Sequence, residues 1–513
     1  MTKRETALLQ HDPRTLVLAV IAVGTLVRFL LAARLGLGVD ETYAVAVARQ
    51  WSLSYFDHPP LHFWLAGGTA KMVGSEAGAV VRLPFVLCFI ATTWLTFTLA
   101  ARLFGERAGA FAALVLNVSA VFSLSTGGWV LPDGPLMLAM LCAANVLASI
   151  LFEDQPSMPN VRWVVAGACA GLAMLSKYHG IFVLGGVFVF LITSAPHRRW
   201  LRQPGPYVGA LVALVLFTPV LLWNGKHGWV SFLFQGGRSA GRGGVHVGAL
   251  LTNIGAQAAW VLPWIWVPLA ATFVGSLNAG PRDAKRWFLL CLAAGPIVVF
   301  TLIALRGDVG LPHWQAPGYL FLFPALGAGL AARIDRGDVW ASRWLRASVA
   351  AFAVLVLLLG SHAATGWLGR VAPRLFAKGD PTTDLLDWRA LQPVLSARGL
   401  LPPGAFVAAP SWIQAGKAAV GLGPEVPVLC LCSDPHHFYY LEDDRRFLGR
   451  NAVLVVKVRP NAADDVLAKF GPYFGSIEPL GRVAIRRSDQ TALEVGIYRA
   501  TNFRRVFGTT QPR

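Results

Sequence analysis

The stretch Leu37–Trp64, LGVDETYAVAVARQWSLSYFDHPPLHFW, decides how the rest of the chain is interpreted. It follows the first long apolar run of the sequence and precedes the second. Within it stand the carboxylates Asp40, Glu41 and Asp57, two histidines and a Pro-Pro pair. A segment that only connects two apolar runs needs no more than a short polar turn. The density of ionisable side chains therefore predicts a functional site in this loop.

The chain as a whole is far more apolar than an ordinary soluble domain. Of its 513 residues, 55% are hydrophobic and 14% are charged, and the mean hydropathy is +0.54. This composition indicates a mainly α-helical polytopic membrane protein, because a membrane-crossing helix needs roughly 20 mainly apolar residues. We predict about eleven spans, and the short fifth and sixth could instead form one broken hairpin or re-entrant pair. The predicted spans are 15–37, 79–101, 108–125, 133–152, 163–176, 180–195, 206–223, 247–278, 287–305, 317–332 and 347–368.

The distribution of Lys and Arg predicts the orientation, because basic short loops stay on the cytoplasmic side. With the amino terminus inside, sixteen basic residues fall on the inner side: Lys3, Arg4, Arg14, Arg102, Arg107, Arg162, Arg198, Arg199, Arg202, Arg282, Lys285, Arg286, Arg333, Arg336, Arg343 and Arg346. Seven fall outside: Arg49, Lys71, Lys177, Lys226, Arg238, Arg242 and Arg306. We therefore expect a multi-pass membrane protein whose amino terminus is cytoplasmic. The first span shows no cleavage site and is expected to remain as an anchor.

Residues 369–513 differ in character from the membrane part at 1–368. Short apolar runs such as AFVAAP, PVLCLC, NAVLVVKV and EVGIYRA predict buried strands, and LLDWRALQPVLSARG predicts an amphipathic helix. Eleven crossings place this segment on the outer side, so we expect a C-terminal soluble α/β or α+β domain on the outer face of the membrane. Cys430 and Cys432 are too close in sequence for an easy mutual disulfide and receive no function. The net charge of +18 is mostly the positive-inside bias, and nothing indicates nucleic-acid binding.

The first outer loop, 38–78, is expected to hold two helices at the membrane interface. Apolar residues recur at helical spacing between Glu41 and Leu53, which predicts an amphipathic helix. A second helix is predicted from Pro59 or Pro60 to Val73, because proline is tolerated in a first helical turn. The alternative is a solvated loop resting on the membrane with Asp40 as a helix cap.

Further ionisable residues stand in the other predicted outer loops. Asp133 opens the fourth span, where it could simply cap the helix. Lys177 and Tyr178 lie between the fifth and sixth spans, and the lysine could merely extend its amine to the surface. The next outer loops add Lys226, His227, Arg238, Arg242, His246, Arg306, Asp308 and His313.

Acidic and basic side chains thus gather on one predicted face. Transfer of a group from a phosphate-bearing donor needs this pairing, since a carboxylate takes a proton from the attacking group and cations stabilise the departing phosphate. A lipid-linked donor would explain a site at the membrane surface. The rival class is a lipid or glycan transporter or flippase. A transporter more often shows internal repeats and ionisable residues at mid-membrane, where Arg28 is nearly alone here.

A series of motifs carries a family resemblance over nearly the whole chain. DETY, YFDHPPLHFW, RLP, PDGPL, SKYHG, PVLLWNGKHGWVSFLFQGGR and SDPHHFYYLEDDRRFLGRNAVLVV occur in this order. The chain resembles the PMT_2-type membrane glycosyltransferases (families 39 and 83) with the GT-C fold, relatives of protein O-mannosyltransferases and lipid A aminoarabinose transferases. The resemblance implies a polyprenyl (undecaprenyl) phosphate sugar donor. It also implies transfer on the periplasmic face to lipid A, another envelope glycan, a lipid or a protein.

The resemblance also implies roles for individual residues. Asp40 is similar to the family's catalytic acidic residue, with Glu41 beside it, and Asp133 resembles the second acidic residue. Aminoarabinose enzymes have Glu-Lys-Pro-Pro where this chain has Asp57-His58-Pro59-Pro60, and an arginine where it has Tyr43. Because both changes remove a cation, aminoarabinose itself is in doubt. The candidates for holding the donor phosphate are His58, Lys177, Tyr178, Lys226, Arg238 and Arg242.

These observations lead to one functional prediction. We expect an inverting membrane glycosyltransferase in which Asp40 is the general base, while Glu41 and Asp133 orient the acceptor or tune that base. No cofactor is required by this scheme. A divalent ion (Zn, Mg or Mn) held by Asp57 with His227, His246 or His313 is an alternative, because carboxylate and imidazole suit zinc.

Overall fold

The chain forms two compact units whose segments alternate along the sequence. The computed structural model describes residues 12–155, 157–239, 243–307, 310–377, 379–458 and 466–504. The first unit comprises Met1–Phe29, Leu53–His62 and Leu83–Val354, and the second comprises Leu30–Ser52, Phe63–Arg82 and Leu355–Arg513, each as far as it is described. The loop between the first two long helices therefore contributes to both units. Each unit is considered by itself below.

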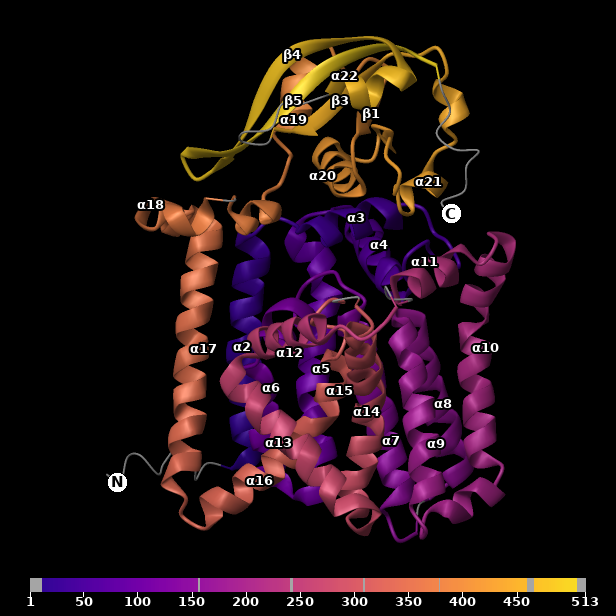
Figure 1. Ribbon diagram of the computed structural model, residues 1–513, viewed down its shortest axis with the longest axis vertical. Helices are drawn as coiled ribbons and strands as arrows, with labels where there is room; N and C mark the ends of the chain where they lie inside the picture. The colour runs from indigo at the N-terminus through magenta and orange to yellow at the C-terminus, as the bar shows by residue number, and fades with distance from the viewer. Residues whose placement is uncertain are drawn as a thin grey trace. The chain divides into compact units, whose positions relative to one another are not determined.

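The first unit is built from helices, most of them long ribbons in Figure 1. Its elements are most of α2 (Pro13–Arg34) and α5 (Gly78–Phe104), then α6 (Glu106–Asn117), the π-helix η1 (Val121–Thr126), α7 (Asp133–Leu151), α8 (Pro159–Ser176), η2 (Tyr178–Gly180), α9 (Ile181–Thr193), η3 (Arg198–Arg202), α10 (Gly205–Lys226), α11 (Val230–Ser239), α12 (Val247–Val261), α13 (Pro263–Ala279), η4 (Gly280–Arg282), α14 (Ala284–Leu305), α15 (Ala316–Tyr319), η5 (Leu320–Leu322), α16 (Phe323–Asp335) and part of α17 (Val339–Thr365).

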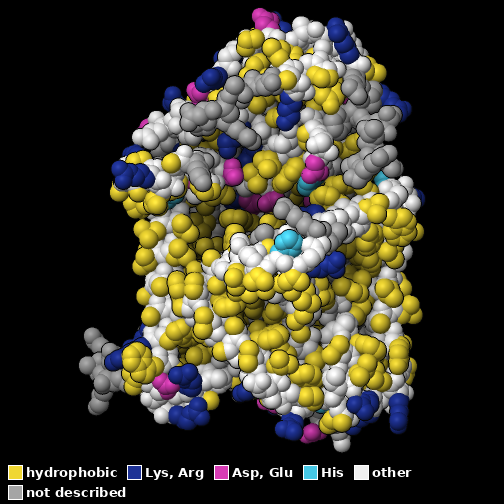
Figure 2. Space-filling model, viewed as in Figure 1, with side chains coloured by type: hydrophobic (Ala, Val, Ile, Leu, Met, Phe, Trp, Pro, Cys, Tyr) yellow, Lys and Arg dark blue, Asp and Glu magenta, His cyan; other side chains and the backbone are white. Residues whose placement is uncertain are grey.

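The helices confirm a polytopic membrane protein. Seven segments are long and apolar enough to cross a membrane by length and composition, namely α2, α5, α7, α10, α14, Ala316–Asp335 and α17, and α12 with α13 would make an eighth. The other three predicted spans correspond to α6, α8 and α9, with 12, 18 and 13 residues. Figure 2 shows hydrophobic side chains covering the helical body, with Lys and Arg gathered at its lower end. This is the surface expected of helices that face lipid.

The predicted span 247–278 is not one helix. Its two halves, α12 and α13, meet at an angle of 113°. Leu262 between them has a φ of 85°, outside the helical region, and α13 begins at Pro263. Because proline has no N–H to donate and its ring clashes with a preceding turn, the helix stops before it. The sequence contained this proline, but the continuous apolar run concealed the break.

Small residues allow α8 to pack closely against its neighbours. Helix α8 lies between α7 and α10, which it contacts along much of its length (Figure 1). A Cβ atom at Gly167 would overlap the backbone of Gly209 on α10. Glycine at this position therefore sets the distance between the two helices, as small residues do at helix crossings in membranes.

The second unit contains a five-stranded mixed sheet with the order β2-β1-β3-β5-β4. Its strands are β1 (Phe406–Ala409), β2 (Val428–Cys430), β3 (Ala452–Lys457), β4 (Phe474–Arg487) and β5 (Gln490–Phe503). β1 pairs in parallel with β2 and β3, and β5 pairs antiparallel with β3 and β4. The α/β prediction for this segment is confirmed, although β4 was not predicted, because its alternation of exposed and buried residues is irregular.

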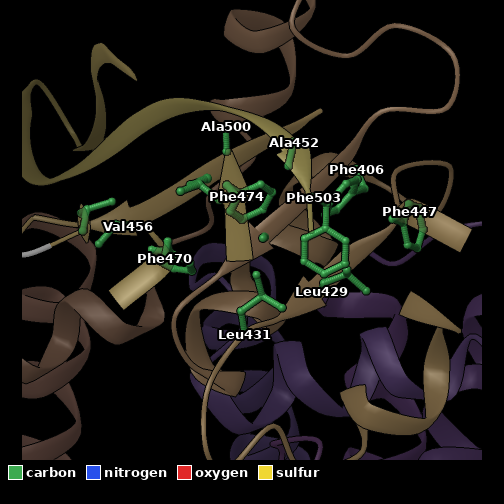
Figure 3. Packing of buried hydrophobic residues seen from close by; sticks show 13 residues of the cluster. Phe406, Leu429, Leu431, Phe447, Ala452, Val456, Phe470, Phe474, Ala500 and Phe503 are labelled. Carbon is green, nitrogen blue, oxygen red and sulfur yellow. The ribbon is translucent and has the colours of Figure 1, made fainter. Parts of the chain in front are cut away.

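Aromatic side chains form the core of this sheet. Figure 3 shows the rings of Phe406, Phe474 and Phe503 converging, and the Phe474 and Phe503 centroids are 5.3 Å apart. Phe447 and Phe470 are buried in the same cluster. Aromatic rings bury much apolar area each, so this cluster can hold short strands together. The shorter helical elements of the unit are α18 (Trp367–Val371), η6 (Pro373–Phe376), η7 (Pro381–Leu385), α19 (Leu391–Ala397), α20 (Trp412–Leu422), α21 (Phe438–Leu441), η8 (Asp444–Phe447), α22 (Val466–Phe470) and η9 (Gly471–Tyr473).

The first outer loop supplies two further helices to the second unit. They are α3 (Val39–Ala48) and α4 (Leu61–Val73), the latter starting close to the predicted position. Every residue of α3 from Glu41 to Ala48 is buried, and α20 packs against it. Helix α3 is therefore an internal element with no solvated face on these residues, in contrast to the amphipathic interfacial helix that the sequence predicted.

We expect Gly167→Val to destabilise the protein, because the added side chain must separate α8 from α10. Overpacking of this kind costs about 1–3 kcal/mol. The measurement is the melting temperature of the purified full chain in detergent. Gly185→Val on α9 is the matched control, since a Cβ there meets no atom within 4 Å. Equal melting temperatures for both variants would contradict the proposed close approach.

Candidate functional site

A buried ion pair between Lys177 and Asp133 stands at the centre of the first unit's polar residues. The Nζ atom of Lys177 donates to both carboxylate oxygens of Asp133, at 2.9 and 3.1 Å. Both side chains are buried. Asp133 is the first residue of α7, where the helix dipole favours a negative charge. Lys177 follows the end of α8 in an extended conformation. The lysine is therefore directed inward, and does not extend its amine to the surface.

Histidines surround this pair. The ring centroids of His58 and His62 are 5.7 Å apart, and Nε2 of His58 lies 4.0 Å from Oδ2 of Asp57. His179 follows Tyr178 and stacks on Phe300 at 4.5 Å. His58 and His62 both experience the charge of Lys177.

Burial keeps these imidazoles neutral. It lowers the pKa of His62 to about 3 and that of His58 well below its usual value. Burial, followed by the charge of Lys177, also lowers the pKa of His313 to about 4. A neutral imidazole offers one N–H donor and one acceptor nitrogen.

Helix α11 holds the middle of the first outer loop. Ser231 Oγ donates to the carbonyl oxygen of Tyr55 at 3.1 Å, and Gln235 Nε2 donates to that of Asp57 at 2.5 Å. One turn further along α11, Arg238 lies over the rings of Phe234 and Trp314, at 5.4 and 5.3 Å. In the described part of the chain Arg238 forms no ion pair. Its charge acts on His58 and His313.

We define the polar cluster as Asp57, His58, His62, Asp133, Lys177, His179, Arg238 and His313. Its two cations and two carboxylates balance, so the neutral histidines leave no net charge. Among the described residues, Nδ1 of His58 and Nε2 of His179 are buried without a hydrogen-bond partner. A buried polar atom without a partner costs roughly 1–3 kcal/mol. The cluster therefore has unused hydrogen-bonding capacity beside two cations, which suits an anionic ligand with several oxygen atoms.

The second unit places Asp40 at the start of α3, beside a second buried ion pair. Asp40 is exposed, whereas the neighbouring Glu41 is buried. Glu41 accepts hydrogen bonds from Nε and Nη2 of Arg82, at 2.7 and 2.5 Å, and from the backbone N–H of Gly38 at 2.7 Å. Arg82 also donates to the carbonyl oxygens of Leu35 and Gly36. These bonds fix the first turn of α3 and occupy both Glu41 oxygens, which gives Glu41 a positioning role.

Other buried groups also hold α3 in place. Lys417 on α20 donates to the carbonyl oxygen of Leu37 at 2.5 Å, and burial lowers its pKa to about 8. The Tyr43 hydroxyl accepts from the backbone N–H of His437 at 3.1 Å. The Tyr43 ring also meets that of Trp412 edge-on at 5.4 Å. The backbone that carries Asp40 is therefore rigidly supported within its unit.

The candidate metal ligands do not come together. Within the described residues, no three His, Cys, Asp or Glu side chains form a group that could hold a metal ion. Asp57, His227 and His313 are thus not brought into one site, and the His227 ring stacks on Trp223 at 4.0 Å. The donor set for a divalent ion is not assembled here, and no step below uses one.

The remaining phosphate candidates are dispersed. Tyr178 lies beside Lys177, and its ring contacts Phe217 and Phe232. Lys226 is the exposed last residue of α10, and in the described part of the chain no hydrogen bond or ion pair joins it to the polar cluster. Arg242 lies outside the described residues.

Sequence reasoning missed several of the residues that build these sites. His62 received no role although it stands in the first turn of α4, four residues after His58. Arg82 was part of a recognised motif but was given no partner. A charged residue inside a predicted apolar span usually needs one, and this rule could have paired Arg82 with an acid. For Lys417 and Gln235 we find no sequence signal, because their partners are backbone oxygens far away in the chain.

Comparisons with known proteins give one matching family model and several membrane glycosyltransferases as relatives. Residues 57–223 match the model of the dolichyl-phosphate-mannose-protein mannosyltransferases. The chain is 24% identical over 495 residues to the lipopolysaccharide core galacturonosyltransferase RgtB of Rhizobium johnstonii, covering 82% of this chain and 93% of the relative. It is 27% identical over 190 residues to the lipid A galacturonosyltransferase RgtD of the same organism, covering 37% of this chain and 38% of that one.

One solved structure shares the fold over almost its whole length. It is ArnT from Cupriavidus metallidurans bound to undecaprenyl phosphate, with a TM-score of 0.62 and 18% sequence identity. The superposition covers 94% of this chain and 97% of ArnT. At this identity the likeness shows the fold, which is the GT-C fold that the motifs predicted.

We expect the free energy of unfolding to decrease as the pH falls below about 6.5. His58, His62 and His313 take up protons in the unfolded chain near that value, whereas the folded pKa values of the latter two are about 3 and 4. Each such histidine costs about 1 kcal/mol at pH 5.5. Melting temperatures at pH 7.5, 6.5 and 5.5 would measure this trend. His313→Gln should flatten it, and a trend identical to that of the unaltered protein would contradict the buried neutral state.

We expect Glu41→Gln and Arg82→Gln each to lower stability strongly, by about 3–5 kcal/mol, because each leaves a buried charge without its partner. The double variant should lose less than the sum of the two losses. A double-mutant cycle on melting temperatures measures the coupling. Glu106→Gln is the control, since its ion pair with Arg14 is solvent-exposed and exposed pairs contribute little. Additive losses would show that the two side chains act independently.

Proposed function

We propose that this chain, a PMT_2-type membrane glycosyltransferase with the GT-C fold, transfers a sugar from polyprenyl phosphate to lipopolysaccharide on the periplasmic face of the inner membrane. The observation that carries the proposal is the polar cluster around Lys177 and Asp133, with Arg238 and the unused ring nitrogens of His58 and His179. Such groups can replace the water that a phosphate loses when it leaves solution. The full-length relative RgtB, named for transfer to the lipopolysaccharide core, supports the acceptor.

The cluster provides the donor's phosphate with charge and hydrogen bonds together. Lys177 and Arg238 supply positive charge, and the unpartnered ring nitrogens of His58 and His179 can donate hydrogen bonds in the matching tautomer. Because Lys177 and both histidines are buried, interactions with them are stronger than they would be in solution. The phosphate is also the leaving group. Cations that hold it therefore stabilise the charge that develops as the glycosidic bond breaks.

The reaction needs one base and one leaving group. Asp40 takes the proton from the acceptor hydroxyl while the hydroxyl oxygen of the acceptor attacks the anomeric carbon of the sugar. The bond from that carbon to the phosphate oxygen breaks, and polyprenyl phosphate departs with the electron pair. Attack opposite the leaving group inverts the configuration of the sugar carbon. Glu41 does not react; it holds the α3 turn that carries Asp40. The exposure of Asp40 suits a base that meets an incoming acceptor.

The charges of the helical ends support the orientation in this proposal. Lys and Arg gather at one end of the helical body (Figure 2), and such residues remain on the cytoplasmic side. With the amino terminus on that side, Asp133 and Lys177 would lie at the periplasmic ends of α7 and α8.

We expect Asp40→Asn to abolish transfer while leaving the affinity for undecaprenyl phosphate unchanged, because the base does not hold the phosphate. Arg238→Gln should lower the affinity for undecaprenyl phosphate by tenfold or more, since loss of a charge-assisted contact costs about 1.5–3 kcal/mol. Affinity and single-turnover transfer are measured on the same purified preparations. Asp489→Asn on an exposed turn and Lys71→Met on α4 are the charge-matched controls. Weakened phosphate binding in Asp40→Asn would refute the division of roles.

Mass spectrometry of lipopolysaccharide from a deletion strain tests the substrate. We expect the loss of one sugar residue from lipid A or the core, and the missing mass identifies the sugar. Complementation with the intact chain should restore it, and complementation with Asp40→Asn should not. Unchanged lipopolysaccharide, with a sugar missing from a protein or another lipid instead, would overturn the proposed acceptor.

A further inference from the structure

A cavity of about 650 Å³ opens between α13, α14, α16 and α17 of the first unit. It lies at the basic end of these helices, at the opposite end of α14 from the loop that carries His313. Arg286 and Arg333 line its polar side, and Gly275, Gly329 and Trp344 line the rest together with aliphatic side chains. None of these residues takes part in the proposed transfer reaction.

The charge around the cavity is strongly positive. The lining residues Arg286 and Arg333 belong, with the start of α17, to three short segments that hold seven basic residues: Arg282, Lys285, Arg286, Arg333, Arg336, Arg343 and Arg346. Three acids accompany them: Asp283, Asp335 and Asp338. The surplus of four positive charges favours an anionic occupant and disfavours a cation.

The two arginines at the cavity are held ready for such an occupant. Arg333 donates through Nε to Asp338 at 2.7 Å, and Nε of Arg286 lies 3.4 Å from Asp283. Within the described residues, the terminal Nη groups of both arginines make no hydrogen bond. Each acid thus orients a guanidinium group through Nε, and the two Nη groups of the arginine stay available. Two such N–H groups side by side can bind a phosphate through two parallel hydrogen bonds.

The rest of the wall suits hydrocarbon chains. A Cβ atom built at Gly275 or Gly329 meets no atom within 4 Å, so both glycines face open space in α13 and α16. Trp340 and Trp344 flank the cavity at the start of α17, and the Trp344 indole donates to the carbonyl oxygen of Trp264. Tryptophan prefers the boundary between headgroups and acyl chains. The guanidinium groups of Arg286 and Arg333 thus lie beside an apolar groove, at the level where tryptophans meet lipid headgroups.

We propose that this cavity is a binding site for an acidic phospholipid, such as phosphatidylglycerol or cardiolipin. The lipid phosphate binds between Arg286 and Arg333, and an acyl chain lies along Gly275 and Gly329. Basic pockets between helices at the cytoplasmic surface are the setting in which such headgroups bind. A zwitterionic lipid would bring its own cation into a positive rim and gains less. The site is separate from the polar cluster, so it binds lipid whether or not sugar transfer occurs as proposed.

Native mass spectrometry of the delipidated full chain tests the proposal, with phosphatidylglycerol, cardiolipin and phosphatidylethanolamine as probes. We expect one acidic lipid to stay bound, at least fivefold more than phosphatidylethanolamine at equal concentration. Arg286→Gln with Arg333→Gln should remove this preference. Gly275→Phe with Gly329→Phe should also remove it by filling the groove, and it leaves every charge in place.

Two control variants keep the result interpretable. Arg199→Gln with Arg202→Gln removes the same charge from an exposed segment at the same basic end. Gly185→Phe with Gly255→Phe adds the same bulk where a Cβ also meets open space. Both controls should retain the bound acidic lipid. Equal retention of all three lipids, or an equal loss in the control and the groove variants, would overturn the proposal.

Discussion

The buried ion pair between Lys177 and Asp133 is the constraint on which the first unit's site depends. Two charges removed from water cost several kcal/mol each and are tolerated only when paired and hydrogen-bonded. Here the lysine contacts both carboxylate oxygens. The pair joins the start of α7 to the end of α8, so the two helices must meet at this point. Its lysine also adds to the burial that keeps the neighbouring histidines uncharged.

The loop that the sequence singled out serves both units. Its first part forms α3, which carries Asp40 and belongs to the second unit, while Asp57, His58 and His62 belong to the first. Within the first unit, the loop adds Asp57, His58 and His62 to the polar cluster around Lys177 and Asp133. Within the second unit, it carries Asp40, which is exposed at the start of a buried helix.

The sequence predicted the fold class well because hydropathy alone identifies long apolar helices, and in lipid a helix satisfies its own backbone. It failed where one residue interrupts a long pattern. The apolar run across Leu262 and Pro263 hid a break of 113°. Sequence reasoning also failed to pair charged side chains whose partners are distant in the chain. The Lys177–Asp133 pair joins residues 44 positions apart, and Lys417 binds a backbone oxygen 380 positions away. Such pairings depend on how helices pack, which no local spacing encodes.

The central claim is that the two cations of the polar cluster, the buried Lys177 and the half-buried Arg238, hold the donor's phosphate. It is tested most directly by ³¹P NMR of undecaprenyl phosphate bound to the protein, titrated between pH 8 and pH 5. A phosphate monoester loses its second proton near pH 6, and nearby cations favour the dianion. The account predicts an apparent pKa about one unit lower than in the same detergent without protein, a shift reduced by Arg238→Gln. An unchanged or raised pKa in the complex would contradict it.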